Sequence, residues 1–297
     1  MTSTVAVLGL GAMGLPMARH LASSFSVRAY DIDPDRAAAA GGFAEVCSSA
    51  HDAATGSDAV LVAVRNQEQL VALLWGDDGI VPALADGAVV VLTSTVGIDA
   101  VRDVAERLAG DNVHLVDAPV SGGPGRAGTG DLLVVVGAGD DAWEAGQPVL
   151  QEMASTLVRV GERAGDGQSM KTVNQLLCGV HIAAAAEALA LAGALGLDQA
   201  KALETLMAGA AASFMLGDRG PRALQAFDDG GAEVRSRLDI FVKDMGIVAA
   251  AARDVHVATP VAGAAQHLFL LGEAAGLGAE DDSSIIRLLG PVDRSQA

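Results

Sequence analysis

Residues 5–14 read Val-Ala-Val-Leu-Gly-Leu-Gly-Ala-Met-Gly, an apolar run that leads directly into a Gly-x-Gly-x-x-Gly turn. The apolar residues predict a buried strand, and the residues after the turn predict a helix that ends near Ala22. Gly9 permits a tight turn, Gly11 lets backbone N–H groups approach a pyrophosphate, and Gly14 lets the helix lie close to the strand. The helix N-terminus attracts the same negative charge. The stretch therefore predicts a dinucleotide-binding turn.

Residues 27–30 (Val-Arg-Ala-Tyr) predict a second strand, which delivers Asp31 to the position of a ribose. A carboxylate there can accept hydrogen bonds from both ribose hydroxyls of NAD, whereas it repels the 2′-phosphate of NADP. Ile32 follows, where an NADP site favours Arg, and Arg36 is the nearest cation that could weaken the preference. We therefore predict NAD rather than NADP. The residues expected to contact it lie in the turn and at the strand end: Gly9, Leu10, Gly11, Ala12, Met13, Gly14 and Asp31.

The composition narrows the class of protein. The chain has 297 residues, enough for two ordinary domains, and only 3% are aromatic, so Ala, Val and Leu must fill the core. A net charge of −18 without a basic cluster argues against a nucleic-acid partner. Cys47 and Cys178 are far apart and form no CxxC pair, so we interpret them as two buried thiols. His181 has no partner ligand in the sequence, and no metal site is expected.

Two segments bear on location. The N-terminus has no cationic region before its apolar run, so no signal peptide is expected and a cytoplasmic location is predicted. Residues 180–197 are long and apolar enough to be mistaken for a membrane span. Glu187 lies in the middle of that segment and charged anchors are missing from its flanks, so we expect a helix buried between subunits or domains and no membrane.

The first half of the chain alternates short apolar runs with helical patterns, which predicts a parallel sheet covered by helices on both faces. After the first two strands, the strand candidates are Ala59–Ala63, Ala88–Leu92, Val113–Val116, Leu132–Val136 and Leu157–Val160. The helix candidates between them include Gln67–Leu74, Ile98–Leu108 and Asp141–Met153. Ser121–Gly130 contains five glycines in ten residues and is predicted to be a loop near the carboxyl ends of the strands, where ligands bind in such sheets.

From Gln168 onward the pattern becomes Ala- and Leu-rich with helical periodicity. The predicted helices are Gln168–Gly193, Asp198–Ala211, Ser236–Arg253, Pro260–Ala275 and Ser283–Leu289. We predict an α/β Rossmann-type doubly wound domain over residues 1–162, followed by an all-α domain over residues 163–297 for substrate binding and oligomerisation.

Four blocks together resemble the β-hydroxyacid dehydrogenase family, which includes 3-hydroxyisobutyrate dehydrogenase and tartronate semialdehyde reductase. In order along the chain, the blocks are residues 9–17 (Gly-Leu-Gly-Ala-Met-Gly-Leu-Pro-Met), 117–123 (Asp-Ala-Pro-Val-Ser-Gly-Gly), 165–171 (Gly-Asp-Gly-Gln-Ser-Met-Lys) and 243–244 (Lys-Asp). Residues 176–182 with Glu187, and residues 240–247, resemble the L-threonate dehydrogenase branch. The resemblance implies oxidation of a small hydroxylated acid with a nicotinamide cofactor.

Lys171 is the candidate for proton transfer. Oxidation of an alcohol needs a base, and a lysine can act as one where burial disfavours its charged form. An ordinary solvated lysine near a helix start is the alternative from spacing alone, whereas the family's lysine in this block is the general acid/base. Asn174 and Gln175 lie one turn further on and could bond substrate oxygens. The family usually has Asn at both positions, so Gln175 is a departure that could shift the accepted substrate.

Other candidates belong to binding. Ser121, Gly122 and Gly123 suit a carboxylate because a hydroxyl and backbone N–H groups can converge on it, and the family binds its substrate acid with this block. Thr95 matches a family position near the nicotinamide ribose, although its sequence position also suits a helix N-cap. The resemblance further implies that Lys243 reaches the cofactor from the helical domain.

These observations predict an NAD-dependent dehydrogenase of an L-threonate-like or 3-hydroxyisobutyrate-like acid. The rival enzymes are an NADPH-dependent semialdehyde or glyoxylate reductase, which Asp31 disfavours, and an imine reductase, which usually lacks the lysine. A non-catalytic nucleotide-binding interaction module is the rival outside enzymes, and Lys171 with the Ser-Gly-Gly block favours catalysis over it. The resemblance also implies a homodimer or homotetramer assembled through the helical half.

Overall fold

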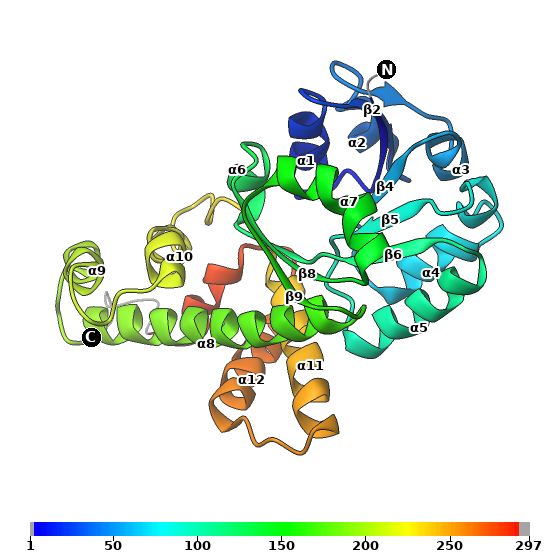
Figure 1. The fold of residues 1–297 in the computed structure, drawn as a ribbon. Helices are drawn as coiled ribbons and strands as arrows, with labels where there is room; N and C mark the ends of the chain where they lie inside the picture. Colours follow the sequence, from blue (N-terminus) through cyan, green and yellow to red (C-terminus); the bar gives the residue numbers. More distant parts are fainter. Residues whose placement is uncertain (1–2, 291–297) are drawn as a thin grey trace. The chain divides into compact units, whose positions relative to one another are not determined.

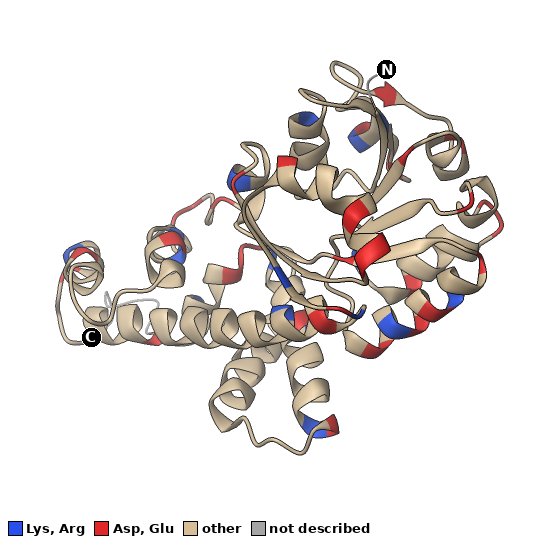
Figure 2. Cartoon of the chain, in the orientation of Figure 1, with Lys and Arg blue, Asp and Glu red and all other residues tan. Residues whose placement is uncertain are grey.

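The computed structural model describes residues 3–290, and the chain divides into two compact units, Met1–Lys171 and Thr172–Ala297. The first unit holds the β-sheet, and the described part of the second is built from helices (Figure 1). The division after Lys171 leaves the first turns of a long helix with the sheet, beyond the boundary predicted after residue 162. Lys and Arg residues occur in both units (Figure 2).

The sheet of the first unit follows the order β3-β2-β1-β4-β5-β6-β8-β7, with β9 paired to β8. Its strands are β1 (Thr4–Leu8), β2 (Ser26–Tyr30), β3 (Glu45–Val46), β4 (Ala59–Val62), β5 (Val89–Leu92), β6 (His114–Asp117), β7 (Val120–Ser121), β8 (Leu132–Gly137) and β9 (Ala154–Gly161). The predicted parallel pairing is confirmed from β3 through β6. It is wrong for β8, which runs antiparallel to β6 and β7. The connection from β7 to β8 is short, and a parallel crossover needs a dozen or more residues.

Both faces of the sheet are covered, as the doubly wound prediction requires. Alternate residues of β1 enter different cores: Val5 and Val7 join one cluster, whereas Ala6 and Leu8 join the other. The first cluster receives the apolar sides of α1 (Gly14–Leu21), α6 (Gly123–Ala127) and α7 (Asp140–Met153). The second receives α3 (Ala50–Ala54), α4 (Gln67–Trp75), η1 (Val81–Ala83) and α5 (Ile98–Gly110), and α2 (Pro34–Ala38) follows β2. The Rossmann-type fold is therefore confirmed.

The segment Ser121–Gly130 is not simply the loop that its glycines predicted. Ser121 ends β7, and the five residues of α6 begin after one intervening residue, the N-cap Gly122. Gly122 has φ of +140°, a value that favours glycine, and Pro124 in the first turn pre-sets helical φ. A prediction from glycine content alone could not see this short helix.

The second unit continues α8 (Asp166–Ala194), which begins in the first, and adds α9 (Gln199–Met207), α10 (Phe214–Gln225), α11 (Leu238–Asp254), α12 (Pro260–Ala274) and the 3₁₀-helix η2 (Asp282–Leu288). The predicted helices are confirmed with small shifts, except that the last one is 3₁₀ rather than α. Phe241 and Phe269 stack between α11 and α12, with ring centroids 5.3 Å apart.

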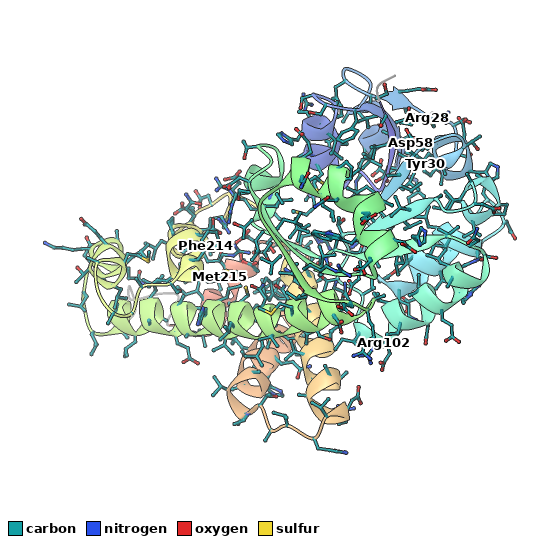
Figure 3. All side chains as sticks on the ribbon, viewed as in Figure 1. Arg28, Tyr30, Asp58, Arg102, Phe214 and Met215 are labelled. Carbon is teal, nitrogen blue, oxygen red and sulfur yellow. The ribbon has the colours of Figure 1, made fainter. Side chains whose placement is uncertain are left out.

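Helix α10 was missed. It begins at Phe214, next to Met215 (both labelled in Figure 3), and contains Gly217, Gly220 and Pro221, residues that signal turns. A Cβ on Gly220 would stand 2.5 Å from a methyl of Leu203, so this glycine lies against α9 and is not part of a turn.

Helix α8 is long and apolar enough to cross a membrane, and 39% of its most apolar stretch is buried within the chain. Core helices of water-soluble proteins meet the same criteria, so length and composition give weak support for a span.

Candidate active site

The three glycines of the turn after β1 play different parts. Gly9 has φ of +95°, and a Cβ there would stand 2.4 Å from the Ala63 carbonyl oxygen. A Cβ on Gly14 would stand 1.8 Å from the Gly9 carbonyl oxygen, so α1 lies directly against the turn. Beside Gly11, by contrast, the nearest atom is Nη1 of Arg36, at 3.8 Å. The chain's own packing requires Gly9 and Gly14, whereas the space beside Gly11 can admit a pyrophosphate.

Asp31 follows Tyr30 at the end of β2 (Figure 3) and is 8% exposed. Its Oδ2 accepts a hydrogen bond from the Leu10 backbone N–H (2.6 Å), and its Oδ1 accepts one from the Asp33 N–H (2.8 Å). The carboxylate thus ties the glycine turn to β2. Each carboxylate oxygen can accept a further hydrogen bond, so these contacts are compatible with ribose binding.

Arg36, the cation that could weaken NAD preference, has a carboxylate partner. Its Nε stands 3.3 Å from Oδ2 of Asp33, and both side chains are about half exposed. Ile32 is 80% exposed. The Arg36 guanidinium is therefore already paired with a carboxylate.

Lys171 and Ser121 are brought together in the first unit. The Lys171 Nζ donates a hydrogen bond to the Ser121 Oγ across 3.1 Å, and the lysine side chain is only 8% exposed. Ser121 is held by the pairing of β7 with β8, opposite Leu133. The predicted base and the predicted carboxylate-binding block therefore form one cluster.

The two glycines after Ser121 differ in their surroundings. Gly122 is packed closely, because a Cβ there would stand 3.1 Å from the side chains of Arg126 and Leu132. Gly123 has φ of +75° and open space where a Cβ would stand. Arg126 bonds Asp131 in a forked ion pair, with Nε 2.8 Å from Oδ2, which favours its interpretation as a surface charge. The open backbone at Gly123 is what a small anionic group would require.

Thr95 lies between β5 and α5, at the carboxyl edge of the sheet, and is half-buried. Its neighbour Ser94 accepts a hydrogen bond from the Val64 N–H at Oγ (2.8 Å), which joins this segment to the end of β4. Thr95 is not the N-cap of α5, because Gly97 occupies that position.

In the second unit, Asp244 organises the other predicted residues. It is 3% exposed, accepts a hydrogen bond from the Gln175 Nε2 at Oδ2 (2.5 Å) and pairs through Oδ1 with the Lys243 Nζ (3.0 Å). The Asn174 Nδ2 donates to the Gln175 Oε1 (2.9 Å) and to the Cys178 Sγ (3.4 Å). No functional part was predicted for Asp244 from the sequence. Here it is the anion that holds both Gln175 and Lys243.

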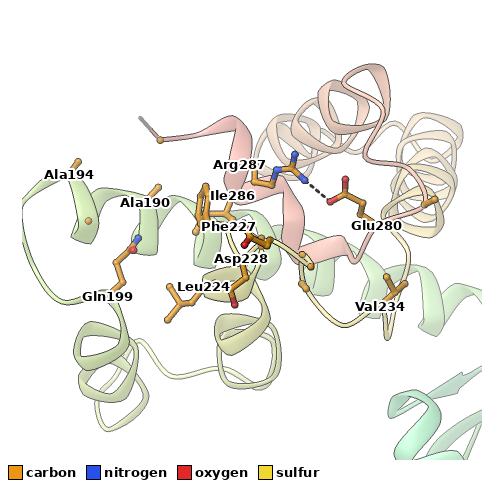
Figure 4. Close-up of a pocket in the computed structure, with 18 of the residues that line it drawn as sticks. Ala190, Ala194, Gln199, Leu224, Phe227, Asp228, Val234, Glu280, Ile286 and Arg287 are labelled. Carbon is orange, nitrogen blue, oxygen red and sulfur yellow. Dashed lines mark hydrogen bonds and ion pairs between the residues drawn. The ribbon is translucent and has the colours of Figure 1, made fainter. Parts of the chain in front are cut away.

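A separate cavity of about 1040 Å³ lies in the second unit (Figure 4). Apolar side chains such as Leu224 and Phe227 line it together with Asp228, and an ion pair joins Arg287 to Glu280 (2.7 Å) beside it. The residues predicted for catalysis and binding are not among its lining. Within residues 3–290 no group of three or more His, Cys, Asp or Glu is arranged to hold a metal ion.

Comparison with known proteins covers nearly the whole chain. Residues 4–161 match the family described as the NAD binding domain of 6-phosphogluconate dehydrogenase. Residues 165–289 match the family described as NAD-binding of NADP-dependent 3-hydroxyisobutyrate dehydrogenase.

Individual relatives agree. The L-threonate dehydrogenase of Cupriavidus necator is 36% identical over 297 residues, which are 99% of this chain and 98% of that protein. The L-threonate dehydrogenase of Escherichia coli K12 is 35% identical, over 97% of this chain and 95% of that one. A crystal structure of 3-hydroxyisobutyrate dehydrogenase from Salmonella typhimurium superposes with a TM-score of 0.88 at 35% identity, covering 96% of this chain and 99% of that chain.

The fold, the glycine turn and these matches define an NAD(P)-binding β-hydroxyacid dehydrogenase. The chain belongs to the 3-hydroxyisobutyrate dehydrogenase-like family, on its L-threonate dehydrogenase branch, and the resemblance drawn from the four sequence blocks is confirmed.

Proposed function

We propose that this chain oxidises a small hydroxylated carboxylic acid with NAD, L-threonate first and 3-hydroxyisobutyrate-like acids second. The observation that carries the proposal is the partly buried contact of 3.1 Å between the Lys171 Nζ and the Ser121 Oγ. It unites a base with a segment suited to a carboxylate, in the unit that also holds the glycine turn. The choice of L-threonate is supported by the names of the relatives in Cupriavidus necator and Escherichia coli.

In this mechanism the Ser121 hydroxyl and the backbone at Gly122 and Gly123 hold the substrate carboxylate. The Lys171 Nζ, in its neutral form, accepts the proton of the reacting hydroxyl, and in the reverse direction it returns that proton. Bound NAD supplies the hydride acceptor. The turn at Gly9–Gly14 would hold its pyrophosphate, Asp31 the adenosine ribose, and Thr95 the nicotinamide ribose.

The residues of the second unit receive supporting parts. We assign Lys243 to the cofactor and Asn174 to the substrate, as the family resemblance implies. Gln175 has its amide engaged by Asp244 on one side and by Asn174 on the other. We therefore assign it the orientation of Asn174 more than a direct contact with substrate.

A screen of initial rates tests the proposal. With NAD, we expect the highest kcat/KM for L-threonate among small hydroxy acids. With that acid, we expect NAD to exceed NADP at least about tenfold in kcat/KM, equivalent to about 1.4 kcal/mol, because Asp31 repels the 2′-phosphate. Turnover with none of the acids would contradict the proposed function. Equal or better efficiency with NADP would contradict only the argument from Asp31, and Arg36 would then be the residue to replace.

We also propose a cytoplasmic homo-oligomer, at least a dimer, assembled through α8. Leu191, in the last turn of this helix, is 59% exposed, and Leu195, just beyond its end, is 69% exposed. Such apolar surface is typical of interfaces. Light scattering at micromolar concentration should give a multiple of the 29.8 kDa chain mass. Leu191→Glu should shift it toward the monomer, whereas Val46→Glu on exposed β3 should not. A monomer mass for the unmodified chain would refute the assembly.

A further inference from the structure

The carboxylate of Asp117 caps the helix that carries Lys171. Asp117 ends β6 and is fully buried. Its Oδ2 accepts hydrogen bonds from the backbone N–H groups of Gly165 (2.8 Å) and Gln168 (2.9 Å), at the first turn of α8. Burial raises the pKa of this carboxyl, and the hydrogen bonds from Gln168, Gly165 and Gly167 oppose that rise. A carboxylate at the N-terminus of a helix accepts hydrogen bonds from N–H groups that have no partner within the helix. Its negative charge also interacts favourably with the positive end of the helix dipole.

The first turn of α8 also lies directly on the backbone of β6. A Cβ on Gly167 would stand 2.5 Å from the Asp117 carbonyl oxygen and 2.9 Å from its Oδ2. A Cβ on Gly137, in the neighbouring strand β8, would stand 2.7 Å from the Gly167 nitrogen. Gly137 and Gly167 therefore allow the start of α8 to pack in direct contact with the backbone of β6 and β8.

Gln168 connects the start of α8 to two neighbouring parts of the sheet. It is 1% exposed, and its Nε2 donates to the Asp117 Oδ1 (2.9 Å) and to the Ser94 carbonyl oxygen (3.0 Å). Its Oε1 accepts from the N–H groups of Val96 (3.1 Å) and Gly97 (3.2 Å). One amide thus joins the start of α8 to the end of β6 and to the segment that follows β5.

We propose that Asp117 and Gln168 are positioning residues, which fix Lys171 relative to Ser121 and to Thr95. Lys171 follows Gln168 by three residues, on the next turn of α8, and Ser121 follows Asp117 by four. Thr95 stands between Ser94 and Val96, which both bond the Gln168 amide. This inference rests on the proposed role of Lys171 as proton acceptor. A displacement of about 1 Å at such a group can cost about a hundredfold in rate.

The test is Gln168→Glu, measured alone and together with Lys171→Ala. The new carboxylate keeps the shape and the acceptor for Val96 and Gly97. It cannot donate a hydrogen bond to the Ser94 carbonyl oxygen. One of its oxygens also replaces the Gln168 Nε2 and faces the Asp117 Oδ1, so two carboxylate oxygens meet. We expect kcat at saturating NAD and acid to fall about tenfold to a hundredfold in the otherwise unmodified enzyme. In the Lys171→Ala background we expect a further loss of less than about threefold, because the group being positioned is gone.

Gln151→Glu, on the exposed side of α7, adds the same charge away from this contact and should leave kcat unchanged. Thermal unfolding is followed for each variant, and Asp117→Asn provides a second break of the same contact if Gln168→Glu does not fold. Equal losses in both backgrounds, or no loss in folded single variants, would overturn the inference. Full activity of the Lys171→Ala single variant would instead overturn the proposed function. This outcome does not depend on the Gln168 variants, so the two failures can be told apart.

Discussion

Lys171→Ala should lower kcat by about a hundredfold to ten-thousandfold, the usual contribution of a positioned acid–base group. The Nζ that contacts the Ser121 Oγ at 3.1 Å is removed, and the alanine leaves no proton acceptor in its place. NAD affinity should change little, because the glycine turn and Asp31 are untouched. The measurements are kcat with the best acid, NAD binding by fluorescence titration, and the thermal unfolding temperature.

Lys201→Ala is the matched control, since this lysine lies exposed on α9 and should be replaceable without loss. A folded Lys171→Ala enzyme that binds NAD and keeps more than about a tenth of the normal kcat would refute the assignment. Gln175→Ala should cost less and act mainly on discrimination between acids. If Gln175→Ala proved equally damaging, the Gln175 amide would be part of the proton-transfer machinery rather than a substrate-orienting group.

Arg222→Met should lower the free energy of unfolding of the second unit by about 3–5 kcal/mol, the cost of leaving a buried charge without its partner. Arg222 is 4% exposed, and its Nε stands 3.1 Å from the Oδ1 of Asp281, which is fully buried. Burial alone would raise the pKa of the Asp281 carboxyl. Hydrogen bonds from Ser283 and the Arg235 backbone, with the charge of Arg222, outweigh it and lower that pKa. The buried group is therefore an anion that Arg222 helps to stabilise.

Arg235→Met is the control for this change. Its side chain bonds Glu233 at the surface. Its backbone N–H donates to the Asp281 Oδ2 (2.9 Å), and the substitution leaves this backbone donor in place. Chemical denaturation of both variants gives the comparison. Loss of stability in Arg235→Met equal to that in Arg222→Met would show that the buried ion pair is not what holds η2 to α10.

Local signals predicted the parts of the fold that local chemistry determines. The strand, turn and helix of residues 4–21 and the acid at Asp31 follow from hydrophobic periodicity and glycine placement, and the structure has them. Helix α10 was missed because Gly217 and Gly220 signal turns in the sequence. In the structure they lie against the side chains of Met207 and Leu203, and these contacts depend on the position of α9.

Contacts between residues that are distant in the sequence also limited the prediction of the site. Lys171 and Ser121 could be named from their blocks, but their contact spans 50 positions in the chain. Asp117 and Gln168 were within quoted blocks without any assigned part, because their partners at Ser94, Val96 and Gly165 are distant in sequence or reached through backbone atoms. Hydrogen bonds of this kind leave no periodic pattern to detect.

The central claim is tested most directly by tracing the hydrogen that leaves the substrate. L-threonate carrying deuterium on every carbinol carbon is incubated with the enzyme and NAD, and the reduced nicotinamide is analysed by mass spectrometry. The account predicts one deuterium in each reduced nicotinamide formed by the unmodified enzyme, and formation at least about a hundredfold slower with Lys171→Ala. Reduced nicotinamide without deuterium, or an undiminished rate in the folded variant, would contradict it.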